Sequence, residues 1–275
     1  MSARTKTRIT KHPEKLGIIA GGGDIPQQLI DVCAEQGIQT VVVGLQGFAE
    51  NINVDLWARI GSGRKIVDFF NHENVSDIVF IGAVKKPNLF NLWPDWETFL
   101  FFLRVWVGSF GDSKILDRAR EVLREHDLNV RGVHEFLPNL LTDEGFYSTN
   151  QDIGKYQRDI ETGILAAKQL GVEDKGQAVI VKDGVTIGFE DNKGTSALIR
   201  RKGQEGAVLV KMCKPQQDKN LDLPTIGANT VEECAKKQMA GIVIEANNSL
   251  IVDKDAVKQA ADAHGLFVYG VTPNG

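Results

Sequence analysis

The stretch Leu16-Gly-Ile-Ile-Ala-Gly-Gly-Gly-Asp-Ile-Pro26 decides the fold of the first half of the chain. Its apolar residues predict a buried strand, its three glycines a tight turn, and Pro26 the first turn of a helix. Further strand signals follow at 40–43, 78–81 and 129–133, with helical spacing between them. Strands that alternate with helices predict a doubly wound α/β domain with a mostly parallel sheet.

The second half of the chain has a different pattern and predicts a mixed α+β domain. An Asp183-Gly184 turn joins two alternating runs between 177 and 190, which is a strong hairpin signal. Strands are also expected at 207–211, 242–245 and 266–269. Helices are expected at 160–171, 230–239 and 254–264, the last two with Thr230 and Asp253 as N-caps.

These patterns divide the chain into four parts. We expect a frayed tail at 1–15, an α/β domain at 16–137, a linker at 138–158 and a C-terminal domain at 159–275. A cleft between the two domains is the expected place for a ligand.

Composition excludes several classes of protein. With 32 Lys and Arg against 36 Asp and Glu, the net charge of −4 offers no general attraction for nucleic acid or anionic membranes. Three cysteines without CxxC spacing argue against a disulfide framework and favour the reducing cytoplasm. The most apolar window, 99–107, is too short to cross a bilayer and predicts a buried or dimer-facing helix.

The glycine turn is a candidate phosphate site. Backbone N–H groups at the start of a helix can hold a phosphate, although a purely structural tight turn is the alternative. Pro26 stands where the dinucleotide fingerprint needs its third glycine, and the strand at 40–43 ends without an acid for a ribose. Both features disfavour NAD.

The stretch from Lys211 to Gly227 carries the most reactive set of side chains. Its two prolines predict a loop after a strand. Asp218 and Asp222 could bind a divalent cation, while Lys214 could neutralise phosphate oxygens. The alternative is a solvated loop with chance charges. His134, at the end of a predicted strand, is either a ligand contact or a packing residue.

In their order along the chain, these motifs resemble the LpxI-type UDP-2,3-diacylglucosamine pyrophosphatase family of lipid A biosynthesis. The matching stretches include His134-Glu-Phe-Leu-Pro-Asn-Leu-Leu141, Gly194-Thr195, Lys214-Pro-x-Gln-Asp218 and Asp222-Leu-Pro-Thr-Ile-Gly227. The resemblance implies a Rossmann-like N-terminal domain and a distinct C-terminal domain. It also implies Mg2+-dependent hydrolysis of the pyrophosphate, which gives 2,3-diacylglucosamine 1-phosphate and UMP.

The resemblance also implies roles for individual residues. Asp222 is the first candidate for the catalytic and metal-binding acid, and Asp218 is the second. The substrate-binding positions are Gly21, Gly22, Gly23, Asp24, Thr195, Lys214 and Gln217.

The implied partner is an acylated nucleotide-sugar, met in the cytoplasm. Contact with the inner face of the inner membrane and a homodimer are left open. Lys193, Ser196 and Asn220 stand where the family has two acids and an arginine. These departures leave open a divergent or non-catalytic paralogue that binds a nucleotide or an acylated sugar phosphate.

Overall fold

The computed structural model describes residues 12–59, 61–84, 120–121, 123–216, 219–220 and 223–273. They form two compact units, one of residues 12–84 and 120–131 and the other of residues 132–273. The helix expected at 99–107 lies outside the described residues. So do the candidate site residues Gln217, Asp218 and Asp222.

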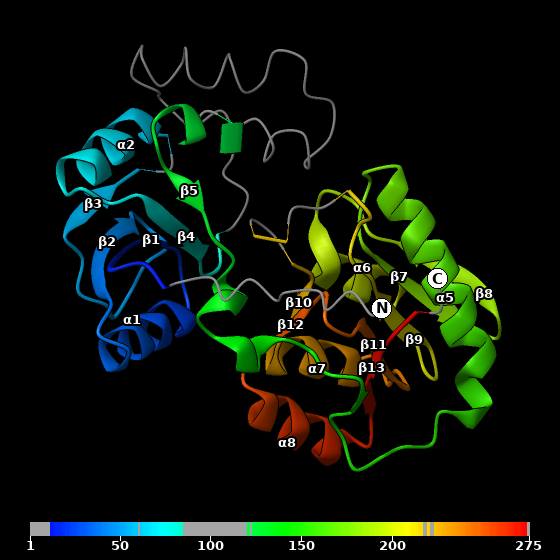
Figure 1. Cartoon of the computed structure of the whole chain (residues 1–275). Coiled ribbons are helices and arrows are strands. Elements are labelled where there is room, and N and C mark those ends of the chain that lie inside the picture. The colour runs from blue at the N-terminus through cyan, green and yellow to red at the C-terminus, as the bar shows by residue number, and fades with distance from the viewer. Residues whose placement is uncertain are drawn as a thin grey trace, which may run out of the picture. The chain divides into compact units, whose positions relative to one another are not determined.

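The first unit is a parallel five-stranded sheet in the order β3-β2-β1-β4-β5. Its strands are β1 (Lys15–Ala20), β2 (Gln39–Leu45), β3 (Leu56–Ala58), β4 (Asp77–Ile81) and β5 (Asn129–Val130). Helices α1 (Ile25–Glu35) and α2 (Gly63–His72) lie on opposite sides of this sheet (Figure 1). The strand order reverses between β1 and β4, which confirms the doubly wound, Rossmann-like prediction.

The second unit has a six-stranded mixed sheet in the order β6-β13-β11-β9-β7-β8. Its strands are β6 (Gly145–Phe146), β7 (Ala178–Lys182), β8 (Val185–Phe189), β9 (Val208–Lys211), β11 (Gly241–Glu245) and β13 (Phe267–Val271). Strands β9, β11 and β13 are parallel, whereas β6, β7 and β8 run antiparallel to their neighbours. A separate pair joins β10 (Thr225–Ile226) to β12 (Leu250–Ile251). The mixed α+β prediction is confirmed.

Helices cover both faces of this second sheet. They are α5 (Gln157–Val172), α6 (Gly194–Lys202), α7 (Ala228–Ala235) and α8 (Lys254–His264). Along β7, Val179 and Val181 pack in the core on the α5 side, while Ala178 and Ile180 pack in the core that includes α6, α7 and α8. Alternate residues point to opposite faces, so two covered faces require an unbroken apolar run.

For this unit the sequence predicts a hairpin turn at Asp183-Gly184 and helix N-caps at Thr230 and Asp253. The Asp183-Gly184 turn joins β7 to β8 with φ of 53° and 77°, the positive values that such a tight hairpin needs. Asp253 caps α8, since its carboxylate accepts the N–H of Ala256. The prediction of Thr230 as a cap is wrong, because α7 begins two residues earlier, at Ala228.

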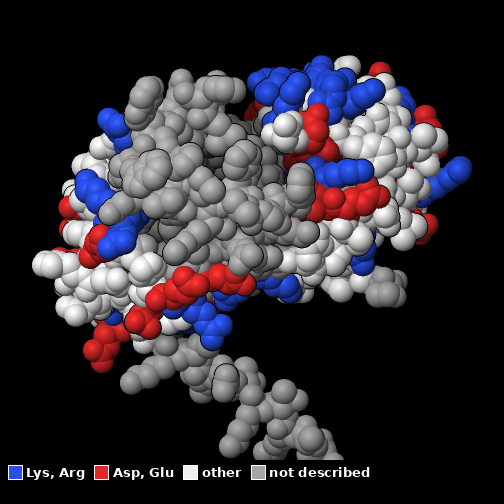
Figure 2. Space-filling view, turned by 90° about the horizontal axis from the view of Figure 1, so that it is seen from above, with Lys and Arg blue, Asp and Glu red and all other residues white. Residues whose placement is uncertain are grey.

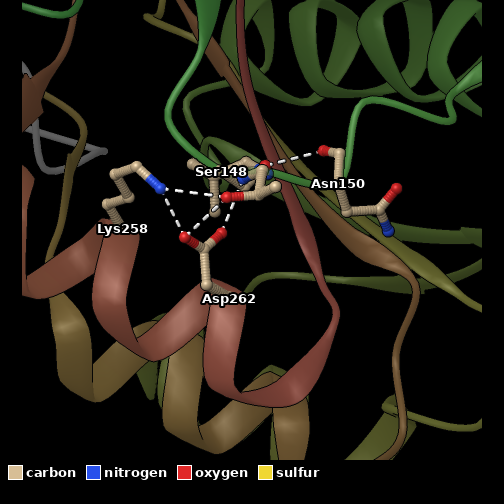
Figure 3. A network of polar contacts seen from close by, with 6 residues as sticks. Ser148, Asn150, Lys258 and Asp262 are labelled. Carbon is tan, nitrogen blue, oxygen red and sulfur yellow. Dashed lines mark hydrogen bonds and ion pairs between the residues drawn. The ribbon is translucent and has the colours of Figure 1, made fainter.

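Residues 138–158, the predicted linker, are fixed to elements of the second unit. The N–H and hydroxyl of Thr149 donate to the carboxylate of Asp262 on α8, at 2.6 and 2.8 Å. Lys258 contacts the same carboxylate (Figure 3). The Asn150 side chain donates to the carbonyl of Gly265 at the end of α8. The Lys258 hydrogen bond, followed by those from Thr149, lowers the pKa of Asp262 to about 2.

Basic and acidic side chains lie beside one another in several places on the face drawn in Figure 2. At the last turn of α6, Arg200 pairs with Glu233 and Arg201 pairs with Asp191. Basic groups there also suit the negative end of the helix dipole. Within the described ranges, no helix combines the length and the apolarity needed to cross a membrane.

Candidate active site

One edge of the second sheet gathers buried polar residues. In register, Lys211 at the end of β9 pairs with Ala178 at the start of β7 and with Ile244 near the end of β11. Phe189 at the end of β8 pairs with Val179, so β8 ends at the same edge. Six residues at or beside this edge form what we call the strand-edge cluster. They are Asp174, Glu190, Thr195, Lys211, Lys214 and Glu245.

Glu190 connects two parts of this cluster. The residue is only 9% exposed, and its carboxylate accepts the N–H of Gln177 at 2.9 Å and the hydroxyl of Thr195 at 2.6 Å. Thr195, a predicted substrate contact, therefore has its hydroxyl proton directed at a carboxylate. Its oxygen keeps lone pairs that can accept a hydrogen bond. The side-chain oxygen of Gln177 is also buried and has no hydrogen-bond partner among the described residues.

Lys214 forms an ion pair with Asp174, with 2.8 Å between Nζ and Oδ1. The two side chains are 10% and 14% exposed, so water screens the pair weakly. The end of α5 packs closely on this lysine, because a Cβ at Gly171 would lie 3.2 Å from the Lys214 Cα. Gln216 donates to the Gly171 carbonyl at 2.6 Å. These contacts fix the start of the 211–227 loop.

Two further contacts of the cluster hold this loop at the sheet edge. The Lys211 ammonium donates to the carbonyl of Thr225 at 2.9 Å, which joins the beginning of the loop to its end. Glu245 accepts the N–H of Cys213 at 2.9 Å and the side-chain amide of Asn248 at 2.8 Å. The two ends of the loop that carries the candidate acids, at Lys211 and Thr225, are therefore joined at this edge of the sheet.

His134 lies beside the same loop. A Cβ built on Gly132 would lie 2.2 Å from His134 Cε1 and 2.9 Å from Asn220 Oδ1, so the imidazole and this loop residue meet over Gly132. Burial is the main cause that lowers the pKa of His134; Glu135 opposes it and Lys219 adds to it. The imidazole is therefore neutral at pH 7.

In the first unit, the glycine turn follows β1 at the point where the strand order reverses. The N–H groups of Gly21 and Gly22 donate to the carbonyls of Ile81 and Ala83, at 2.8 and 2.9 Å. A Cβ on Gly21 would lie 2.9 Å from the Ala83 oxygen, so part of the glycine requirement is close packing. Gly23, with φ of 91°, needs glycine for its backbone conformation.

The start of α1 bears on the predicted phosphate contact. Asp24 stands at the N-cap position and makes no side-chain cap hydrogen bond. Because Gly21 and Gly22 donate to carbonyls, the phosphate contact predicted for this loop depends on Gly23, Asp24 and the first turn of the helix. That contact remains a prediction.

Mg2+ in proteins is held by oxygen ligands, usually one or two carboxylates together with substrate phosphates and water. No group of three His, Cys, Asp or Glu side chains among the described residues is arranged to hold a metal. The carboxylates of Glu190 and Glu245 at the strand edge accept hydrogen bonds from protein donors. The magnesium site predicted from the sequence rests on Asp218 and Asp222, which lie outside the described residues.

The sequence interpretation missed four members of the cluster. Glu245 ends an apolar run, and Glu190 ends an alternating one. An acidic residue at the end of a predicted strand could therefore have identified both as site candidates. Lys211 had the same position on β9. Asp174 had no signal of its own, because its partner is 40 residues away.

Comparison with known proteins matches both units. The LpxI N-terminal domain model matches residues 15–140, and the LpxI C-terminal domain model matches residues 143–269. A curated relative, UDP-2,3-diacylglucosamine pyrophosphatase LpxI of Caulobacter vibrioides (strain ATCC 19089 / CIP 103742 / CB 15), is 33% identical over 94% of this chain and 98% of its own length.

A solved structure of CobK precorrin-6A reductase covers 95% of this chain and 90% of its own, at 10% identity and a TM-score of 0.35, which is too low to inform the fold. The two domain models and the curated relative, in contrast, extend over nearly the whole sequence. On those matches, the chain belongs to the LpxI family.

Proposed function

We propose that this protein hydrolyses the pyrophosphate bond of UDP-2,3-diacylglucosamine, giving 2,3-diacylglucosamine 1-phosphate and UMP. The observation that carries the proposal is the 33% identity to a relative of that name over nearly the full length of both chains. The reaction needs charge to be offset on phosphoryl oxygens and water to be activated.

We further propose that a divalent cation, Mg2+ in the first instance, takes part through Asp222 and Asp218. Carboxylates from one short loop, together with substrate phosphates, are a common way to hold Mg2+. The contacts of Lys211 and Glu245 support this assignment, since they hold the start and end of that loop at the sheet edge. Thr195, Lys214 and Gln217 are proposed to contact the substrate.

A turnover assay tests the proposal. Purified protein with UDP-2,3-diacylglucosamine and Mg2+ is expected to release UMP, and EDTA is expected to stop the release. Asp222→Asn removes the charge with little change of volume and is expected to lower kcat at least about 100-fold. Asp152→Asn is the matched control, because Asp152 is exposed. Absence of UMP from the wild-type reaction, or unchanged turnover of Asp222→Asn, would overturn the proposal.

The second candidate is a paralogue that binds the same ligand without hydrolysis. It is favoured by Lys193 and Ser196, which stand at positions where the resemblance implies acids. Tight binding of UDP-2,3-diacylglucosamine without release of UMP supports this alternative.

The proposal also covers location and assembly. A cytoplasmic protein acting on an acylated nucleotide-sugar would meet its substrate at the inner face of the membrane. Cys33, Cys213 and Cys234 are buried thiols, which suits a reducing compartment. Flotation with vesicles and sedimentation of the pure protein test the membrane contact and the homodimer.

A further inference from the structure

Gly132 makes room for the side chain of His134. The imidazole belongs to the short 3₁₀ turn Val133–Glu135, and Glu135 accepts the N–H of Gly132 at 2.9 Å. A Cβ on Gly132 would lie 2.2 Å from Cε1 of the ring and 2.6 Å from Nδ1. With φ of −76°, the backbone at Gly132 is open to any residue. Glycine is therefore needed here for the space that the ring takes.

The ring faces the loop to which the reaction is assigned. The same Cβ position on Gly132, next to the imidazole, is also 2.9 Å from Oδ1 of Asn220. Asn220 stands two positions along the chain from both Asp218 and Asp222. Lys219 lies near enough to the ring to act on its titration. His134 thus neighbours the loop of the candidate acids.

One atom of this ring has no hydrogen-bond role among the residues that the structure describes. His134 Nδ1 is buried and has no hydrogen-bond partner among the described residues. Buried polar atoms in folded proteins are nearly always paired, so an unpaired one needs an explanation. Among the described residues, Glu135 and Lys219 are the charged groups that act on the pKa of the ring, and burial, which lowers this pKa, favours the neutral imidazole. A neutral imidazole donates from one ring nitrogen and accepts at the other.

We propose that His134 is a further catalytic residue, whose Nδ1–H donates a hydrogen bond to a phosphoryl oxygen of the substrate pyrophosphate. This inference rests on the proposed function. No proton is transferred in it: the imidazole stabilises negative charge on the phosphoryl oxygen as a neutral donor. The orientation of the ring, and with it the nitrogen that donates, is fixed by the packing of the imidazole on Gly132. A larger residue at 132 would fill the space that the ring occupies.

The test separates the two ring nitrogens. An asparagine amide falls near the position of Nδ1, and a glutamine amide falls near Nε2. We therefore expect His134→Asn to keep kcat within a few-fold of wild type, and both His134→Gln and His134→Ala to lose about 10- to 100-fold. Gly132→Ala keeps the imidazole but displaces it and should show a similar loss. The matched control is His72→Gln, since the His72 side chain is 84% exposed.

Two further readouts keep the inference independent of folding and of the proposed function. Melting temperatures show which variants fold. Equilibrium binding of labelled UDP-2,3-diacylglucosamine in EDTA should weaken about 10-fold in His134→Gln and little in His134→Asn. If the wild type binds without hydrolysis, the proposed function fails, and the binding comparison still decides the role of His134. Equal kcat and affinity in all folded His134 variants would overturn the inference alone. Absence of both binding and turnover in the wild type would overturn both.

Discussion

Asp174→Asn tests the ion pair that holds Lys214. The substitution keeps the volume of the side chain and removes its charge. Removing one partner of a buried ion pair costs about 3–5 kcal/mol. Here the side chains are 10% and 14% exposed, and an amide oxygen remains as an acceptor for the ammonium. We therefore expect the free energy of unfolding to fall by about 2–3 kcal/mol, and the melting temperature by about 4 to 12 °C.

A double-mutant cycle isolates the pair from other effects of each substitution. Lys214→Met, Asp174→Asn and the double variant should give a coupling energy of about 1–3 kcal/mol in denaturant unfolding. The control cycle uses Lys175 and Glu173, whose charged atoms are also 2.8 Å apart but whose side chains are 68% and 41% exposed. That exposed pair should show no measurable coupling. A coupling below about 0.5 kcal/mol for the buried pair would refute the reasoning.

The same variants test the proposed contact of Lys214 with the substrate. If the ammonium also offsets charge on a phosphoryl oxygen, Lys214→Met should lower kcat well beyond the effect of Asp174→Asn, which leaves the ammonium in place. Equal turnover in the two folded variants would leave Lys214 with a structural role only.

Two other predictions concern α8. Because hydrogen bonds from Lys258 and Thr149 lower the pKa of Asp262 to about 2, its ionised form stabilises the fold above the ordinary carboxyl pKa of 3.8, and this contribution is lost as the pH falls from about 4 to about 2. Melting temperatures between pH 5 and pH 2 should fall less for Asp262→Asn than for wild type; parallel curves would contradict this. Asp253 accepts the N–H of Ala256 at 2.9 Å with φ of 56°. Asp253→Ala should therefore cost about 1 kcal/mol, and Asp253→Gly less, since glycine adopts positive φ without strain; urea unfolding that ranks them in reverse would contradict the cap.

Features fixed by local chemistry were predictable from the sequence. The Asp183-Gly184 turn needs two residues that tolerate positive φ, and an Asp-Gly pair can be recognised directly in the sequence. Asp253 precedes an apolar helical pattern and caps it. The apolar runs of β1 and β9 were found because strands covered on both faces carry no polar interruptions.

Features that depend on tertiary contacts were missed. Helix α6 begins with Gly194-Thr195-Ser196, residues typical of a turn, and its first turn has no acidic residue. What supports the helix is the burial of Leu198 and Ile199 in the core of the second unit, and the partners of these residues are distant in sequence. Likewise, β10 is only two residues long and exists because it pairs with β12.

For the site, the sequence located the loop but not what holds it. A row of lysines and aspartates within a few residues suggested that Lys214 faces a phosphate. In the structure its ammonium contacts Asp174, 40 residues away. Glu245 accepts the backbone N–H of Cys213, which lies 32 residues earlier in the chain. Pairings over such distances are set by strand order, which no local pattern encodes.

Lys193 bears most directly on the choice between an enzyme and a binding paralogue. Its position is the N-cap of α6, where its side chain is exposed and its N–H donates to Asp191 at 2.9 Å. The buried carboxylate at this edge belongs to Glu190, three residues earlier, and Glu190 is the acceptor for Thr195. A lysine at 193 therefore takes no carboxylate out of the buried network. Since its exposed side chain also adds no cation there, the strand-edge cluster keeps the acids that hold Thr195 and the loop, and the proposed hydrolysis rests on Asp222 and Asp218 rather than on the residue at 193.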